Sequence, residues 1–435
     1  MKRIYLDYAA SSPVATEVEA VMRSYFLNKF GNAGSLHSFG QEAIAALDES
    51  RETIANAVGA NFREIIFTGS ATEANNLALR GALKGFRVSG LGSSVKKSLN
   101  PSGYTLTPRI IVSAIEHESI LETARDLEKE GAEIIYLPVS KKGIINLKKL
   151  KEFLNERTIL VSVMYANNEI GTIQPISEIA KIISDFRKQM TNNKEQIAKN
   201  KSIRHKPLAI NHWPLLHTDA VQAFQFLDCD VKKLGVDLMT LSGHKIYGPK
   251  GVGALYIANR VLGLGSNVKK SLNPSDYTLT PIITGGGQEF GLRSGTENIP
   301  LIVGFAEAVE LATNNRAKEA KRIGALRDYL WKGIKNMCPK AERNGDTKKV
   351  LPNFLNVYFP DYNAADLLVR LDLAGIAVSA GSACSARSSE PSYVIEALGL
   401  KGKRSSRSIR ITLGRQTSRR DIDTALKIIK NITKR

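Results

Sequence analysis

Short apolar runs alternate with helical patterns between about residue 40 and residue 310 of this 435-residue chain, and this alternation constrains the fold most strongly. A helical pattern at 41–60 precedes a short β-rich run at 64–70, and a second helical pattern follows at 71–85. Strands that alternate with helices form βαβ units whose strands pair in parallel. The sequence therefore predicts an α/β fold in which helices flank a mostly parallel sheet.

The pattern changes near residue 315. A charged helical segment is followed by strand-like and helical stretches, and the chain ends on the strand-like 408–414 and the helical 418–432. We assign residues 16–315 to a large domain. Residues 1–15 and 316–435 are assigned to a smaller α+β domain.

One stretch of the chain is duplicated. Residues 88–108 recur as residues 261–281 with 18 of 21 positions identical, and both copies are rich in Gly, Ser, Asn and Pro. Two isolated copies do not make a solenoid, so we interpret them as surface-loop insertions at about 86–108 and 261–281. A pair of matched binding arms is the alternative. A third insertion, basic and without apolar periodicity, is expected at about 190–213.

Charge and composition narrow the functional classes. The formal net charge is +19, but no nucleic-acid motif and no arginine stripe with interleaved aromatic residues accompanies it, which argues against direct nucleic-acid binding. No apolar run approaches the length of a membrane span. The first residues lack the apolar stretch of a secretory signal, so a cytoplasmic location is expected. Three cysteines without a paired spacing argue against a disulfide framework or a bound metal.

Polar residues follow the predicted strands where each strand ends. In parallel sheets, ligands bind at the carboxyl ends of the strands, so these residues are expected to form one pocket. The five clusters are 68–72, 116–118, 167–169, 219–222 and 242–245.

Lys245 stands in the stretch "SGHKIYGPKG", where a buried strand runs into a glycine-containing turn. A desolvated, positioned lysine can form an imine with an aldehyde cofactor, of which pyridoxal phosphate is the common one. This cofactor needs a carboxylate for its pyridine nitrogen and small donors or helix N-terminal amides for its phosphate. Asp219 is the candidate carboxylate.

The remaining requirements also find candidates at the strand ends. Ser242 and His244 flank the lysine, Ala71 and Thr72 begin a helix, and Gln222 and His117 end other strands; these residues suit the phosphate, the ring oxygen and the ring face. Each has an ordinary alternative when taken alone. Asp219 could cap a helix, His117 could be an interior histidine, and Lys245 could lie on the surface.

Nine segments of the chain occur in a characteristic order. They are YLDYAASSPV, FTGSATEANNLALRG, EHESI, NNEIGTIQPI, HTDAVQ, LSGHKIYGPKGVGALY, GGGQEFGLRSGTEN, SAGSACSARSSEPSYVIEALGL and SIRITLGR. Together they resemble the NifS/IscS type of cysteine desulfurase, which are class V, fold-type I pyridoxal-phosphate enzymes. The resemblance covers nearly the whole chain outside the three insertions and implies a sheet of seven strands, pyridoxal 5'-phosphate as cofactor and a homodimer. It also implies removal of sulfur from L-cysteine, which yields alanine and an enzyme-bound persulfide.

The resemblance implies a role for each matching residue. Lys245 would bind the cofactor covalently and move the substrate's α-proton, and His117 would stack on the ring and assist proton transfer. Asp219 would pair with the ring nitrogen and Gln222 with the ring oxygen. The phosphate would be held by Ala71, Thr72, Ser242, Gly243 and His244, with Thr296 from the neighbouring subunit, and the substrate by Arg410, Asn168 and Asn32; Asn168 would also contact the cofactor.

Cys384 carries the second half of this chemistry. Its surroundings at 379–389 are small, polar and glycine-containing, which is typical of a mobile loop, and Arg387 favours the reactive thiolate. The resemblance makes Cys384 the site of the persulfide and a candidate transient ligand of an iron–sulfur cluster. Cys229 and Cys338 lack such a setting and are interpreted as structural thiols.

Two other enzymatic hypotheses stay open: a selenocysteine lyase and another class V aminotransferase, which would not need Cys384. A pyridoxal-phosphate-binding protein associated with RNA is the alternative from a different class. For a desulfurase, the expected sulfur acceptor is an iron–sulfur scaffold protein or a tRNA-thiolation enzyme. The sequence does not choose between these two.

Overall fold

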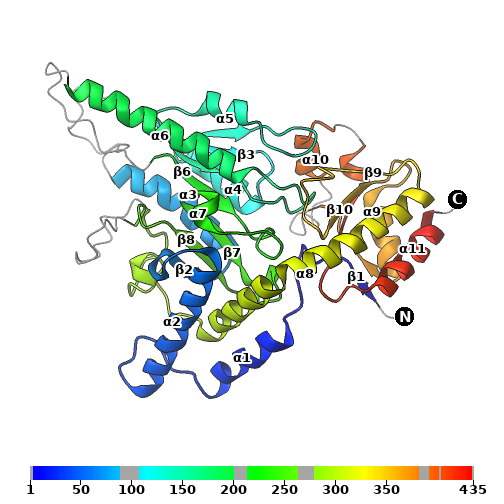
Figure 1. The fold of residues 1–435 in the computed structure, drawn as a ribbon, viewed down its shortest axis with the longest axis horizontal. Coiled ribbons are helices and arrows are strands. Elements are labelled where there is room, and N and C mark those ends of the chain that lie inside the picture. The colour runs from blue at the N-terminus through cyan, green and yellow to red at the C-terminus, as the bar shows by residue number, and fades with distance from the viewer. Residues whose placement is uncertain are drawn as a thin grey trace.

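The computed structural model describes residues 3–88, 107–199, 213–262, 279–381, 391–400 and 403–433, with the backbone alone at 193–199. Most of both duplicated stretches and the predicted persulfide cysteine, Cys384, lie outside the described residues. Figure 1 shows a large body around a central sheet and a smaller body that carries both chain ends. No helix in the described ranges is long and apolar enough to span a membrane.

Twelve strands are present in the described residues. They are β1 (Ile4–Tyr5), β2 (Ile65–Thr68), β3 (Arg109–Ser113), β4 (Glu133–Leu137), β5 (Thr158–Ser162), β6 (Leu215–Asp219), β7 (Leu238–Ser242), β8 (Gly253–Ile257), β9 (Glu342–Arg343), β10 (Phe354–Tyr358), β11 (Ile376–Ala377) and β12 (Ser408–Thr412).

The helices alternate with these strands in the first three quarters of the chain. They are α1 (Thr16–Leu27), α2 (Ser38–Val58), α3 (Ala71–Val88), α4 (Glu118–Lys129), α5 (Leu147–Phe153), α6 (Ile176–Lys199), α7 (Val231–Leu234), α8 (Ile299–Met337), α9 (Ala364–Leu373), α10 (Tyr393–Ala397) and α11 (Arg419–Thr433).

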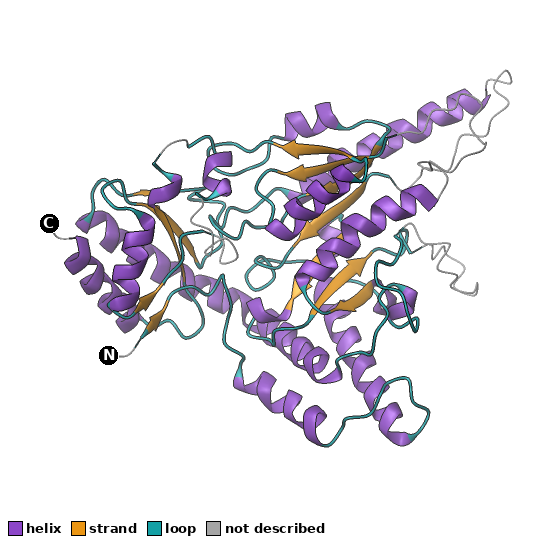
Figure 2. Ribbon diagram, turned by 180° about the vertical axis from the view of Figure 1, so that it is seen from behind, coloured by secondary structure: helices purple, strands orange, loops and turns teal. Residues whose placement is uncertain are grey.

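Seven strands form the central sheet, in the order β2-β8-β7-β6-β5-β3-β4. Only β8 runs antiparallel to its neighbours, and the other pairs are parallel. Every residue of β5, β6 and β7 is buried, as expected for strands covered on both faces. Figure 2 shows helices packed along this sheet. The predicted α/β fold with a mostly parallel seven-stranded sheet is confirmed.

A second hydrophobic cluster lies outside this sheet. It contains residues of the antiparallel sheet β12-β10-β9, of α9 and α11, and of the N-terminal segment through Ile4 and Leu6. Helix α8 joins the two clusters, because its Phe305 lies in the first and its Leu330 in the second. The division into domains at 315/316 stays a prediction, and it falls inside this continuous helix.

The prediction of a loop insertion from residue 190 is wrong at its start, because helix α6 continues to Lys199. Residues 190–199 lack an apolar stripe but contain Lys, Gln, Glu and Ala, which favour helix without burial. The predicted insertion also ends inside the core. Trp213 is buried and meets the ring of Phe86 on α3 edge-on, with 5.9 Å between the ring centroids.

The second duplicated stretch also returns to α3. Leu279 is buried, and the amide of Thr280 donates to the carbonyl of Gly81 at 3.0 Å. A Cβ atom on Gly81 would lie 2.8 Å from the carbonyl oxygen of Thr280, so only glycine allows this approach. The first duplicated stretch begins at Val88, the last residue of α3. All three predicted insertions therefore adjoin or pack against one helix.

A buried ion pair joins α2 to the segment before α8. The guanidinium of Arg51 donates to both carboxylate oxygens of Glu289 at 2.7 and 2.8 Å, and Glu289 also accepts from the amide of Phe67. Phe67 and two further aromatic rings, those of Phe62 and Phe290, lie within 5.5 Å of the guanidinium carbon. Removing either charge would leave the other buried without a partner.

We expect Glu289→Gln to lower the free energy of unfolding by about 3–5 kcal/mol, because a buried guanidinium would lose its counter-charge. Chemical denaturation measures this loss. Glu42→Gln is the control, since Glu42 pairs with Lys29 on the surface at 2.9 Å and should contribute less than about 1 kcal/mol. Equal losses in the two variants would contradict the interpretation.

Candidate functional site

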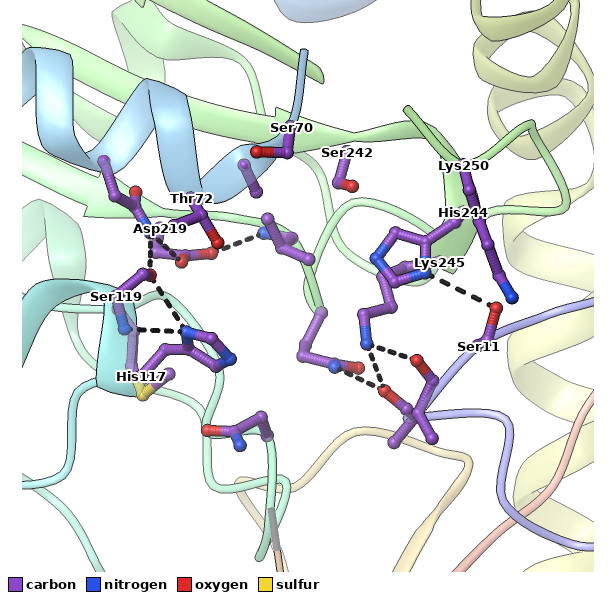
Figure 3. Close-up of a pocket in the computed structure, with 18 of the residues that line it drawn as sticks. Ser11, Ser70, Thr72, His117, Ser119, Asp219, Ser242, His244, Lys245 and Lys250 are labelled. Atoms are coloured by element: carbon purple, nitrogen blue, oxygen red, sulfur yellow. Dashed lines mark hydrogen bonds between the residues drawn. The ribbon is translucent and has the colours of Figure 1, made fainter. Parts of the chain in front are cut away.

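A cavity of about 350 Å³ opens where the carboxyl ends of the parallel strands meet the second cluster (Figure 3). Ten of the predicted site residues line it, together with the segment Ala9–Ser11 and residues from α3 and α4. The ten are Ala71, Thr72, His117, Asn168, Asp219, Gln222, Ser242, His244, Lys245 and Arg410. Their individual roles stay predictions.

Lys245 follows β7 in a short 3-10 turn at 243–245, and its side chain points back into the cavity (Figure 3). The Nζ atom donates to the backbone carbonyls of Ala9 and Ala10, both at 2.7 Å. Gln222 donates to the same Ala9 carbonyl at 3.0 Å. The N-terminal segment thus holds the amine beside the predicted ring-oxygen partner.

Asp219 is the last residue of β6, and both of its carboxylate oxygens accept hydrogen bonds. Oδ1 accepts from the amide of Val221 and Oδ2 from the side-chain amide of Asn75, each at 2.9 Å. Among the described residues that line the cavity, Asp219 is the only acid. A carboxylate held by two N–H donors suits a protonated ring nitrogen.

His117 caps α4, and its ring is oriented by Ser119. Nδ1 accepts from the amide of Ser119 at 3.1 Å and lies 2.9 Å from its hydroxyl, which in turn accepts from Asn75. Burial is the main cause that lowers the pKa of His117. The carboxylate of Asp219 raises this pKa, and the positive charge of Lys245 lowers it. A neutral ring with Nδ1 as acceptor carries its proton on Nε2.

The opposite end of the cavity suits a phosphate group. Helix α3 begins at Ala71, and its first residues line the same cavity as Ser242 and His244 (Figure 3). A Cβ atom on Gly253 would lie 2.9 Å from the amide nitrogen of Ala71, so this approach requires glycine. Burial lowers the pKa of His244 to about 4, so the ring can donate without adding charge.

Arg410 extends from β12 in the second cluster and is buried at 1% exposure. Its guanidinium donates to the carboxylate of Asp7 and to the carbonyl of Asn168, each at 2.8 Å. Its Nε and the side-chain oxygen of Asn168 have no hydrogen-bond partner among the described residues. A small acid entering the cavity would meet a fixed planar donor.

Three predicted residues lie outside the cavity. Gly243 is buried behind it, where a Cβ atom would lie 2.8 Å from the carbonyl of Pro249. Asn32 is exposed between α1 and α2, and its side chain accepts from the amide of Gly34. Thr296 is exposed in the segment before α8. Their predicted roles stay predictions.

Several residues of the site are not among those predicted from the sequence. Asn75 joins Asp219 to Ser119, and it lies four residues after Ala71, on the same face of α3. That helical spacing was the available signal. Met164 and Lys250 also line the cavity, but nothing in the local sequence predicted their positions.

The two described cysteines differ from a reactive thiol. Cys229 is fully buried, and burial raises the pKa of its thiol to about 12; Cys338 is partly buried. No cluster of three or more His, Cys, Asp or Glu side chains that could hold a metal ion occurs in the described ranges.

The residues present fit pyridoxal phosphate. The buried side-chain oxygens of Asn75 and Asn168 lack hydrogen-bond partners among the residues that the structure describes. The cavity also brings together an amine, a carboxylate, an imidazole and a helix N-terminus. These four groups suit, in the same order, the aldehyde, the ring nitrogen, the ring face and the phosphate of the cofactor.

Comparison with known proteins agrees with this fit. The family described as aminotransferase class-V matches residues 4–191 and 206–425. A cysteine desulfurase IscS of Dictyoglomus turgidum is 40% identical over 99% of this chain and 95% of its own. A putative cysteine desulfurase IscS 1 of Bacillus subtilis is 38% identical over the full length of both chains.

Solved structures give the same result. A structure described as a NifS-like protein has a TM-score of 0.79 and 33% identity, with 99% of each chain covered. Another, described as SspA in complex with cysteine, has a TM-score of 0.71 and 34% identity over 94% of this chain and 98% of that one.

The fold, the site and the family match together place this chain in the class V aminotransferase family. Within it, the chain belongs with the cysteine desulfurases of the IscS and NifS type.

We expect Asn75→Ala to weaken cofactor binding about tenfold, because Asp219 would lose one of its two donors. The dissociation constant of pyridoxal phosphate for the apoprotein measures this effect. Asn315→Ala is the control, since Asn315 bonds to the backbone of its own helix and does not line the cavity. An unchanged affinity in Asn75→Ala would contradict the assigned role.

Proposed function

We propose that this protein uses pyridoxal phosphate to remove sulfur from L-cysteine, with alanine as the product and Cys384 as the first sulfur acceptor. One observation carries the proposal: Lys245, Asp219, His117 and Arg410 come from separate elements and line one cavity of suitable size. The relatives named cysteine desulfurase and the NifS-like structures support it.

Bound at this site, the cofactor would withdraw electrons from the substrate's α-carbon through its protonated ring. Lys245 would hold its aldehyde carbon, Asp219 its ring nitrogen, and the start of α3 with Ser242 and His244 its phosphate. His117 would cover the ring face. These assignments follow the donors that already face the cavity.

The substrate's carboxylate would bind Arg410, whose Nε lies buried without a partner in the described part of the chain. This contact would orient the α-carbon toward Nζ of Lys245, which would take the α-proton and later return a proton to the product. His117 would supply a proton from Nε2, because Nδ1 is occupied by the amide of Ser119.

Cys384 lies outside the described residues, so its part rests on the sequence. Its thiolate would attack the substrate's sulfur, and a sulfur–sulfur bond would form as the bond between that sulfur and the β-carbon breaks. The electron pair of the broken bond stays with the carbon skeleton, which leaves as alanine after protonation. L-cysteine and the Cys384 thiol thus become alanine and a persulfide, with no oxidant required.

A homodimer is part of the proposal. Thr296 and Asn32, both predicted to contact ligand, lie on exposed segments away from this chain's own cavity. Near Asn32, large apolar side chains are exposed between the end of α1 and the start of α2, which marks a surface that favours a partner. They are Phe26, Leu27, Phe30, Leu36 and Phe39.

The proposed sulfur acceptor is an iron–sulfur scaffold protein or a tRNA-thiolation enzyme, in line with relatives named IscS. The described surface does not favour one over the other. A transient iron–sulfur ligand role for Cys384 and a cytoplasmic location also stay predictions.

Incubation with L-cysteine should add the mass of one sulfur atom to the peptide that contains Cys384, as measured by mass spectrometry. Cys384→Ala should lose the adduct and about 100-fold in alanine formation, since neither described thiol, Cys229 or Cys338, lines the cavity. Lys245→Ala should lose both the adduct and the visible absorbance of bound cofactor. Cys338→Ser is the control and should retain activity; an adduct on Cys338 instead would refute the assignment.

A further inference from the structure

Glu116 is a buried acid that none of the proposed steps uses. It stands between the end of β3 and His117 and has no exposed surface. Its Oε1 accepts from the backbone amide of Met164 at 2.6 Å, and its Oε2 has no hydrogen-bond partner among the described groups. Its backbone carbonyl accepts from the hydroxyl of Tyr393 at 2.7 Å.

Glu116 therefore connects three parts of the site. Its neighbour His117 and its partner Met164 both line the cavity, one after β3 and the other after β5. Tyr393 is the first residue of α10, and its hydroxyl links this helix to the backbone of Glu116. A substitution of Glu116 should therefore alter the position of His117, the predicted ring-stacking residue.

No cation within the described residues pairs with this carboxyl group. Burial raises the pKa of Glu116 to about 8; the amide of Met164 and the hydroxyl of Ser162 oppose this, and the negative charge of Asp219 adds to it. A second carboxylate charge beside Asp219 would be desolvated without an ion-pair partner, which is costly.

A chain of buried polar groups continues from Ser162. The Ser162 hydroxyl lies 2.9 Å from Nδ1 of His217, whose Nε2 lies 3.0 Å from the hydroxyl of Thr240. His217 is fully buried, and burial lowers its pKa to about 3, so its ring is neutral and carries one proton. His217 lies two residues before Asp219 on β6, so the two side chains are on the same face of the strand.

The described contacts suit a neutral carboxyl group at Glu116 better than a carboxylate. Only one hydrogen bond, from the Met164 amide, reaches its side-chain oxygens among the described residues. An ionised Glu116 would place a second carboxylate charge near Asp219 in the interior, with no cation partner in the described part of the chain.

We propose that Glu116 is a positioning residue whose carboxyl group is protonated in the native protein. In this form it ties the strand end that carries His117 to the strand end that carries Met164. It also leaves Asp219 as the only carboxylate charge at the described cavity. The link to His117 and Asp219 rests on the proposed function, but the protonation state is tested independently of activity.

The test compares thermal unfolding of the cofactor-loaded wild type and Glu116→Gln between about pH 5.5 and about pH 8.5. A raised native pKa means that the native state holds a proton which the unfolded state releases above its ordinary pKa near 4.5. Wild-type stability is then fully present at low pH and is lost as the pH rises through about 8.

Glutamine keeps the contact with Met164, because its side-chain oxygen can accept from the Met164 amide, but it does not titrate. The Tm of the wild type relative to Glu116→Gln should therefore fall by about 3 °C across this range. The other charged or titratable groups near Glu116, namely Asp219, His117, His217 and Lys245, are the same in both proteins.

The proposal would be overturned if the Tm of the wild type relative to Glu116→Gln stayed constant or increased as the pH rises. Glu116 would then be ionised in the native protein. Failure of Glu116→Gln to fold would overturn it as well, since a neutral isostere should suffice. Glu289→Gln serves as the contrast: it neutralises an ion-paired acid and should be destabilised across the whole pH range.

The positioning role has its own spectroscopic readout. The absorption maximum of bound pyridoxal phosphate, and its dependence on pH, should be retained in Glu116→Gln and altered in Glu116→Ala, which leaves the Met164 amide without its acceptor. Identical spectra in all three proteins would overturn the positioning role. If the wild-type protein showed no desulfurase activity, the proposed function would be refuted, but the conclusion drawn from thermal unfolding would remain.

Discussion

The site depends on one buried carboxylate, Asp219, at the end of the central strand β6. Each of its oxygens accepts an N–H hydrogen bond, from Val221 in the next turn and from Asn75 on α3. Asn75 also donates to Ser119, which fixes the imidazole of His117. One amide side chain, that of Asn75, thus connects the carboxylate that would face the ring nitrogen with the serine that orients the imidazole.

The charge of this carboxylate also adds to the cost of ionising the buried acid near it, Glu116. A fully buried Glu116 lies close enough for the charge of Asp219 to raise its pKa further, and neither has a lysine or arginine ion-pair partner in the described structure. Where the chain does bury an ionised acid, at Glu289, it supplies Arg51 and three aromatic rings. The contrast shows two solutions to the same desolvation cost: a counter-ion in one place and a retained proton in the other.

Strand and helix periodicity predicted the α/β fold and the strand-end location of the site, because both follow from local pattern and from the geometry of parallel sheets. The end of α6 was missed, since a helix that leaves the core keeps its hydrogen bonds without an apolar stripe. Asn75 and Met164 were missed because their importance comes from partners distant in sequence, Asp219 and Glu116. Glu116 was noticed as a strand-end residue, but its burial without a counter-ion could not be known before the packing.

Helix α8 has a mechanical consequence. Its 39 residues form one uninterrupted rod about 58 Å long, with one end embedded in each hydrophobic cluster. Hinge rotation between the clusters would have to bend this helix. The helix therefore restricts changes in the distance between Arg410 on one side and Lys245 on the other. Movement within the described site must therefore come from local changes in its segments and not from rotation of one cluster against the other.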